Sequence, residues 1–184
     1  MDRQPEAGAS ARRGDLPAAI VVGVGDPHRR DDGVGSAVVD LLAGRGLDAT
    51  LVTSGGETSA LVDLMRDRDV AFLVDAVRAE PAHPGRVHRI VATRPIAARA
   101  CAAGPHGADV GRAVDLVLAA ERPPRRMVVF AVETADTGPG RGLSAAVAAA
   151  ARRVADEIAA DLPACQVGSF GPGRGRPRPA AWFK

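Results

Sequence analysis

Two adjacent acids stand between a glycine turn and an amphipathic helix in the first quarter of this sequence. Asp31 and Asp32 follow the apolar run 18–22 and a GVG turn, and Gly33 comes directly after them. In open α/β sheets, ligands bind at the loops that follow the carboxyl ends of strands, so acids here are candidates for chemistry. Acids before a helix can instead satisfy its free N–H groups. That second interpretation accounts for one acid more readily than for two.

Two further residues are candidates for the same edge of a sheet. Asp75 closes the apolar run 70–74, where a carboxylate has few structural tasks beyond capping a turn. His106 lies in an irregular segment, residues 93–108, beside glycine and proline. Carboxylates and an imidazole without cysteine form a hard oxygen and nitrogen donor set, which suits nickel, zinc or iron. Three such ligands would leave coordination positions open for substrate or water.

The other acids and histidines have plainer interpretations. We expect Glu57 to be the far partner of Ser54 in a capping box. Glu133 ends an apolar run and could join the same edge, but the sequence gives no second reason. His28 is expected to be an exposed loop side chain, and no role is assigned to the two histidines of a predicted exposed hairpin, His83 and His88.

The glycine turn does not match the known phosphate-binding patterns. A dinucleotide fingerprint, G-x-G-x-x-G, would need glycine at the position of His28, and Ser54 stands where the acid that binds the ribose is expected. No Gly-Lys-Ser/Thr follows, so a P-loop is excluded as well. A small nucleotide-binding domain would therefore require a ligand found at this turn. Carboxylates beside a glycine turn suit a cation better than a phosphate.

Strands and helices alternate along the chain. The hydrophobic pattern predicts buried strands over 18–22, 49–53, 70–74 and 127–132, a more exposed edge strand over 86–92, and helices over 34–42, 57–66, 109–120 and 145–162, the last of them capped by Ser144. This order predicts an α/β fold: a three-layer sandwich around a mostly parallel sheet, with right-handed crossovers.

Composition limits the domain organisation and the class of partner. The 184 residues, 46% of them hydrophobic, are enough for one domain with a full core. We expect a flexible leader over 1–16, the α/β domain over 17–162, and a disordered tail rich in Pro, Gly and Arg over 163–184. No basic stripe carries aromatics and no apolar run could span a membrane, so neither nucleic acid nor membrane is an expected partner. The two cysteines lie outside any CxxC motif and no signal peptide is evident, which favours a cytoplasmic protein.

Six sequence blocks together resemble one known family, the nickel–iron hydrogenase maturation endopeptidases. In order along residues 18–160 they are GVGDPHRRDDGVGSAVVDLL, SGGETSALVDLM, FLVDAV, PGRV, GPHGADVGRAVDLVLA and GLSAAVAAAARRV. The resemblance implies a phosphorylase/hydrolase-like α/β/α sandwich with a mixed five-stranded sheet, one strand of which is antiparallel. It also implies a hydrolase that removes the C-terminal peptide from a hydrogenase large-subunit precursor after nickel insertion.

The resemblance further selects three site residues. By motif position, the family's metal-contacting acids and histidine fall on Asp32, Asp75 and His106. The resemblance thus implies that these residues are catalytic, as in an aspartic-type endopeptidase, and that they contact nickel delivered by the precursor rather than tightly bound. The contact with nickel would position the nearby scissile peptide, and either the metal or a water oriented by one carboxylate would serve hydrolysis.

Two positions depart from the family pattern. Asp26 stands where the family usually has asparagine, and Glu57 follows the glycine pair where threonine is usual. The alternative function is a non-catalytic factor on the same fold, which would check nickel or assist assembly without cutting.

Overall fold

The computed structural model describes residues 18–93 and 106–162. The predicted leader (1–16) and tail (163–184) lie outside the described residues, as does most of the predicted irregular segment 93–108.

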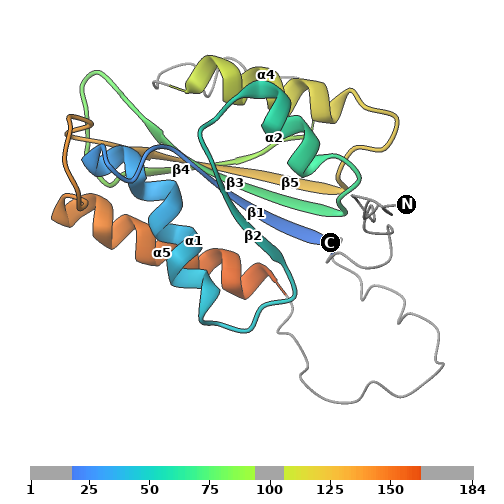
Figure 1. Cartoon of the computed structure of the whole chain (residues 1–184), viewed down its shortest axis with the longest axis horizontal. Coiled ribbons are helices and arrows are strands. Elements are labelled where there is room, and N and C mark those ends of the chain that lie inside the picture. The colour runs from blue at the N-terminus through green and yellow to red at the C-terminus, as the bar shows by residue number, and fades with distance from the viewer. Residues whose placement is uncertain (1–17, 94–105, 163–184) are drawn as a thin grey trace, which may run out of the picture.

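A five-stranded sheet forms the middle layer, with strand order β2-β1-β3-β5-β4 (Figure 1). Four neighbouring strands are parallel, and β4 at the edge is antiparallel to β5. The strands are β1 (Ala19–Val24), β2 (Thr50–Ser54), β3 (Val70–Val77), β4 (Val87–Val91) and β5 (Arg126–Glu133). The predicted mixed, mostly parallel sheet with one antiparallel edge strand is confirmed.

Helices cover both faces of this sheet (Figure 1). On one face lie α1 (Val34–Ala43) and α5 (Ala145–Asp161), and on the other lie α2 (Thr58–Met65) and α4 (Gly107–Leu118). A short 3-10 helix, η1 (Arg30–Gly33), precedes α1. The three-layer sandwich is confirmed. Among these described helices, none has the length and apolar character needed to cross a lipid bilayer.

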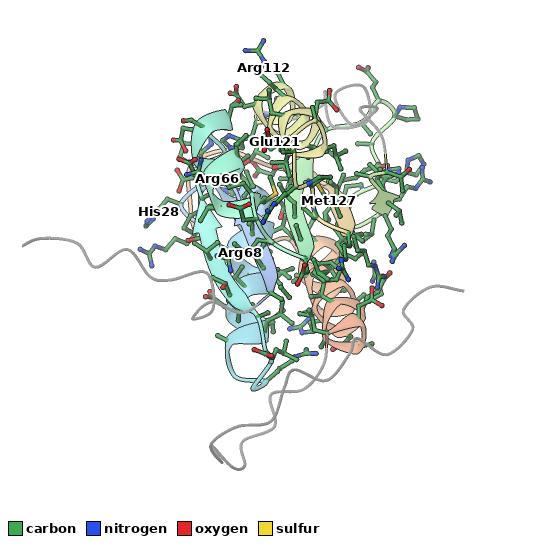
Figure 2. All side chains as sticks on the ribbon, turned by 90° about the vertical axis from the view of Figure 1, so that its right-hand side faces the viewer. His28, Arg66, Arg68, Arg112, Glu121 and Met127 are labelled. Carbon is green, nitrogen blue, oxygen red and sulfur yellow. The ribbon has the colours of Figure 1, made fainter. Side chains whose placement is uncertain are left out.

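The central strands are apolar on both faces because each face has its own core. Alternate residues of β1, β3 and β5 pack against α1 and α5, and the residues between them pack against α2 and α4. The first set includes Val21, Phe72 and Phe130, and the second includes Ile20, Leu73 and Val129. Continuous apolar runs are typical of strands that are buried on both faces. Figure 2 shows the exposed His28 pointing outward and Met127 lying within the body of the protein.

Strand β3 is longer than its apolar run predicts. Its pairing with β5 continues to Val77, which lies beside Glu133. Asp75 therefore lies inside the strand rather than at its end, a correction to the sequence prediction. The strand continues because Ala76 and Val77 are apolar and buried, and a neighbour of the same length satisfies their backbone groups.

The predicted capping box at α2 is wrong. The N-cap of α2 is Glu57 itself, and the hydroxyl of Ser54 accepts a hydrogen bond from the N–H of Gly56. The chain passes through Gly56 in a left-handed conformation (φ +94°) before the helix begins, so Ser54 is too early to cap it.

Candidate active site

The GVG turn allows η1 to fold back onto the end of β1. Gly25 has φ +120°, and a Cβ there would lie 2.0 Å from the main-chain oxygen of Asp32. Only glycine permits both this conformation and this approach. The turn thus positions Asp32. This role accounts for Gly25 without any need for a bound phosphate.

Neither acid of η1 caps the following helix, whose N-cap is Gly33. Asp32 is fully buried, and its Oδ2 accepts a hydrogen bond from the N–H of Asp26 at 2.9 Å. The same oxygen lies 3.4 Å from Nε2 of His106. Asp31 is equally buried but contacts a different segment, which begins at residue 135.

Asp75 is the second buried carboxylate of the site. It follows Leu73 by two residues on β3, so its side chain lies on the sheet face that α2 and α4 cover. One carboxylate oxygen accepts the N–H of Ala76 at 2.9 Å. Burial raises the pKa of Asp75 to about 7; the charge of His106 and the Ala76 N–H oppose this increase and the charge of Asp32 adds to it. Asp75 is therefore close enough to both residues to sense their charges.

The imidazole of His106 comes from the start of α4, where His106 is the N-cap residue. It packs against Gly56, where an added Cβ would lie 3.1 Å from the imidazole ring. Its side chain is one-quarter exposed, in contrast to the buried Asp32. The loops after β1 and β2, the strand β3 and the start of α4 therefore meet around one imidazole.

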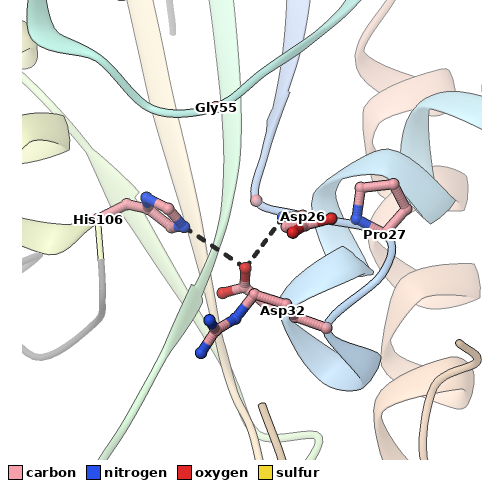
Figure 3. A pocket seen from close by; sticks show the side chains of 7 residues that line it. Asp26, Pro27, Asp32, Gly55 and His106 are labelled. Atoms are coloured by element: carbon pink, nitrogen blue, oxygen red, sulfur yellow. Dashed lines mark hydrogen bonds and ion pairs between the residues drawn. The ribbon is translucent and has the colours of Figure 1, made fainter. Parts of the chain in front are cut away.

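Asp32 and His106 border a cavity of about 500 Å³, and Asp75 is not among its lining residues. Figure 3 shows the carboxylate of Asp32 between the imidazole of His106 and the backbone of Asp26. The lining residues are Gly25, Asp26, Pro27, Arg29, Asp32, Gly55 and His106. Within the described residues, Asp32 Oδ1 and Asp75 Oδ2 are buried without a hydrogen-bond partner. Over residues 18–93 and 106–162, no three His, Cys, Asp or Glu side chains are already arranged to hold a metal ion.

Of the two positions that the sequence singled out, Asp26 lines this cavity and Glu57 does not. Oδ1 of Asp26 accepts the N–H of His28 at 2.8 Å. Asparagine carries the same Oδ1 acceptor, so the change from Asn to Asp keeps the turn and adds a negative charge. Glu57 lies near Gly55, where a Cβ would be 2.9 Å from its Oε1.

A fourth buried carboxylate, Glu133, belongs to the edge hairpin instead. It accepts the N–H of His83 at 2.6 Å and lies 2.7 Å from Nε2 of His88, with Arg86 beside it. The main-chain N–H of His83 is the largest cause that lowers the pKa of Glu133. Sequence reasoning missed this cluster because no pattern of spacing links the hairpin to the end of β5. The antiparallel pairing of Val87 with Val132 brings the two together.

Comparison with known proteins agrees with the fold. Residues 37–161 match the family model for the hydrogenase maturation protease, HycI, which covers more than half of the chain. The chain therefore belongs to the hydrogenase maturation protease family, and its predicted class, a hydrolase that acts in hydrogenase maturation, is confirmed. The matched range contains Asp75 and His106 and begins after Asp32. No curated protein sequence gives a significant match.

Solved structures of such proteases share this fold. The hydrogenase maturating endopeptidase HybD from E. coli superposes with a TM-score of 0.65 at 19% identity, over 78% of this chain and 90% of that one. An endopeptidase from Escherichia coli gives 0.68 at 20% identity over 77% and 90%. The [NiFe] hydrogenase maturation protease HybD from Thermococcus kodakarensis gives 0.62 at 19% identity over 77% and 98%. At these identities the likeness establishes the fold.

Proposed function

We propose that this protein removes the C-terminal peptide from a nickel-loaded hydrogenase large-subunit precursor, and that Asp32, Asp75 and His106 contact the nickel. The observation that carries the proposal is the juxtaposition of the Asp32 carboxylate and the His106 imidazole, 3.4 Å apart at the cavity. Asp75 supports it through its electrostatic proximity to both.

The donor chemistry of these residues fits nickel that arrives as part of the substrate. Asp32 and Asp75 each keep one buried oxygen without a donor among the described residues, and a cation could satisfy both. Imidazole and carboxylate are suitable but not soft ligands, so we expect softer ligands of the precursor, its cysteine thiolates, to hold the nickel more tightly. Thiolates survive in a reducing compartment, and we expect the reaction to occur in the cytoplasm.

Contact with nickel would place the scissile peptide beside the cavity. Hydrolysis adds the hydroxyl of water to the peptide carbonyl and a proton to the departing amine. Fixing the peptide near the acids turns an encounter between two molecules into a reaction within one complex, which lowers the entropic barrier. Nickel thus serves to select a loaded precursor, and the cavity acids orient the attacking water.

The test mixes purified protein with nickel-loaded or nickel-free precursor and weighs the products by mass spectrometry. We expect the loaded precursor alone to lose a peptide, and the Asp32→Ala variant to leave it intact. Equal cleavage of both precursors would contradict the selection by nickel. Binding of loaded precursor without cleavage would instead support an assembly factor.

A further inference from the structure

Asp31 anchors the loop of the site to a distant segment of the chain. Its carboxylate is fully buried and accepts four hydrogen bonds from residues 135–144. The main-chain N–H groups of Ala135 and Asp136 donate at 3.1 and 3.2 Å. Ser144 donates twice, from its N–H at 2.6 Å and from its hydroxyl at 3.0 Å. All four donors to this carboxylate thus belong to one segment of the chain.

Main-chain hydrogen bonds run beside this anchor. The N–H of Asp31 donates to the carbonyl of Asp136, and the N–H of Arg30 donates to the carbonyl of Gly140, both at 3.0 Å. In return, the N–H of Gly140 donates to the carbonyl of His28 at 2.8 Å. The segment before Asp32 is therefore joined to residues 136–140 by its backbone as well as by the Asp31 carboxylate.

The hydroxyl of Ser144 bonds to Asp31 rather than to the helix that Ser144 begins. This residue is the predicted N-cap of α5 and occupies that position, but its side chain makes no capping hydrogen bond. Its hydroxyl goes to Asp31 instead. A serine at an N-cap ordinarily bonds to the helix that it starts, so here the bond to Asp31 takes the place of a capping bond.

Asp32 has no comparable anchor of its own. Within residues 18–93 and 106–162, the Asp32 carboxylate has one hydrogen-bond donor besides His106, the N–H of Asp26, which belongs to the same loop. The place of Asp32 therefore depends on the close approach of Gly25 to its backbone and on its peptide link to the anchored Asp31. We propose that Asp31 is a positioning residue, which fixes η1 on residues 135–144 and so holds the Asp32 carboxylate against His106; its effect on catalysis rests on the proposed function.

The test compares two buried carboxylates. In Asp31→Asn the amide oxygen can replace Oδ2, but an NH₂ group then stands at Oδ1 and faces the N–H of Ser144, so that bond and the negative charge are lost while size is kept. Glu133→Gln is the matched control, because Glu133 is also buried and also accepts a main-chain N–H at a loop. Ser144→Ala removes one of the four bonds, and Ser144→Thr keeps the hydroxyl.

Two readouts separate positioning from simple stability. At a temperature where circular dichroism shows every variant folded, Asp31→Asn should lower kcat for processing by ~10- to 100-fold with KM unchanged, since a displacement of about 1 Å costs that much. The ¹³C–¹H signal of the His106 ring in the free protein should also shift. We expect a smaller effect in Ser144→Ala, and wild-type behaviour in Ser144→Thr and Glu133→Gln.

A wild-type kcat and an unmoved His106 signal in Asp31→Asn would overturn the proposal. An equal shift of that signal in Glu133→Gln would do the same, because it would show general loosening. If Asp31→Asn fails to fold, kcat and the His106 signal are compared between Ser144→Ala and Ser144→Thr. Wild-type values in Ser144→Ala would then overturn the proposal. If the His106 signal shifts as expected but wild type cleaves no precursor, positioning stands and the proposed function fails.

Discussion

Asp31 and Asp32 are consecutive and fully buried, yet their carboxylates contact different parts of the molecule. Asp31 receives four hydrogen bonds from residues 135–144, and Asp32 faces the imidazole of His106. One acid of the pair is satisfied by the scaffold, and the other keeps an oxygen that no described donor reaches. Substitution of Asp31 should therefore lower stability, whereas substitution of Asp32 should leave stability close to that of wild type and abolish processing.

Alanine at each position tests this contrast. Asp31→Ala leaves several buried donors unsatisfied, and should lower the free energy of unfolding by on the order of a few kcal/mol. Asp32→Ala removes a buried carboxylate with an unpaired oxygen, so its melting temperature should stay close to that of wild type or rise. Processing should be abolished in Asp32→Ala although the protein is folded. Thermal unfolding together with the precursor assay checks both results, and a collapse of Asp32→Ala would support a purely structural role.

Stability should depend on pH through Asp75. Its pKa is about 7 in the folded protein and 3.8 in the unfolded chain, so the folded state holds the proton more tightly between these values. The free energy of unfolding contributed by Asp75 therefore falls as pH rises from about 4 to 7, by on the order of a few kcal/mol. Asp75→Asn cannot ionise, so it should gain stability relative to wild type across this range.

Urea unfolding of both proteins from pH 4 to 8 measures the difference. Glu133→Gln provides a control of opposite sign, since the pKa of Glu133 is lowered on folding. Its stabilising contribution is present above the unfolded value of 4.5 and is lost as pH falls, so Glu133→Gln should be weakest relative to wild type at neutral pH. Parallel profiles for wild type and Asp75→Asn would show that Asp75 does not carry the shift.

Periodicity was enough to predict the layers of this fold. Apolar runs such as 70–74 identify the strands, because strands buried on both faces need apolar side chains at every position. Element ends were less predictable. Asp75 interrupts the apolar pattern while β3 continues to Val77, since pairing with β5, which the local sequence does not encode, decides where β3 ends.

The site was predictable only in part, for a similar reason. The residue types of Asp32, Asp75 and His106 indicated chemistry, and the family resemblance selected them. The separate role of Asp31 depends on Ser144, a contact between residues far apart in the chain. The cluster around Glu133 depends on the register of β4 against β5. No spacing rule within a single chain segment reveals such contacts.

Two glycines with similar backbones test the role of close packing at the imidazole. Gly56 has φ +94° and Gly142 has φ +91°, so alanine should cost about 1 kcal/mol of strain at either position. A Cβ at Gly56 would lie 3.1 Å from the His106 ring, whereas nothing lies within 4 Å of one at Gly142. Both variants should show a similar fall in melting temperature, but only Gly56→Ala should slow processing. Equal processing rates would show that the position of His106 tolerates the displacement.

Nickel binding to the isolated protein tests the ligands directly. Among the described residues, those that line the cavity offer carboxylates and one imidazole but no thiolate, so we expect weak binding of Ni²⁺ in calorimetric titration. Binding should weaken further as pH falls, because protons compete with the metal for the same atoms. His106→Ala should abolish most of the signal. His28→Ala removes an exposed imidazole nearby and should bind as wild type does, so it controls for adventitious binding by a histidine.

Asp26→Asn completes this experiment, because it introduces the residue that the family resemblance leads us to expect at this position. The substitution keeps an Oδ1 acceptor for the N–H of His28, and it removes one negative charge from the cavity. If the charge of Asp26 attracts the cation, Asp26→Asn should bind nickel several-fold more weakly with the stoichiometry unchanged. Raising the salt concentration should shrink the difference between the two proteins, since screening weakens a long-range charge effect. A difference that persists at high salt would indicate that Asp26 contacts the metal. Tight, stoichiometric binding to wild type alone would contradict delivery of nickel by the precursor.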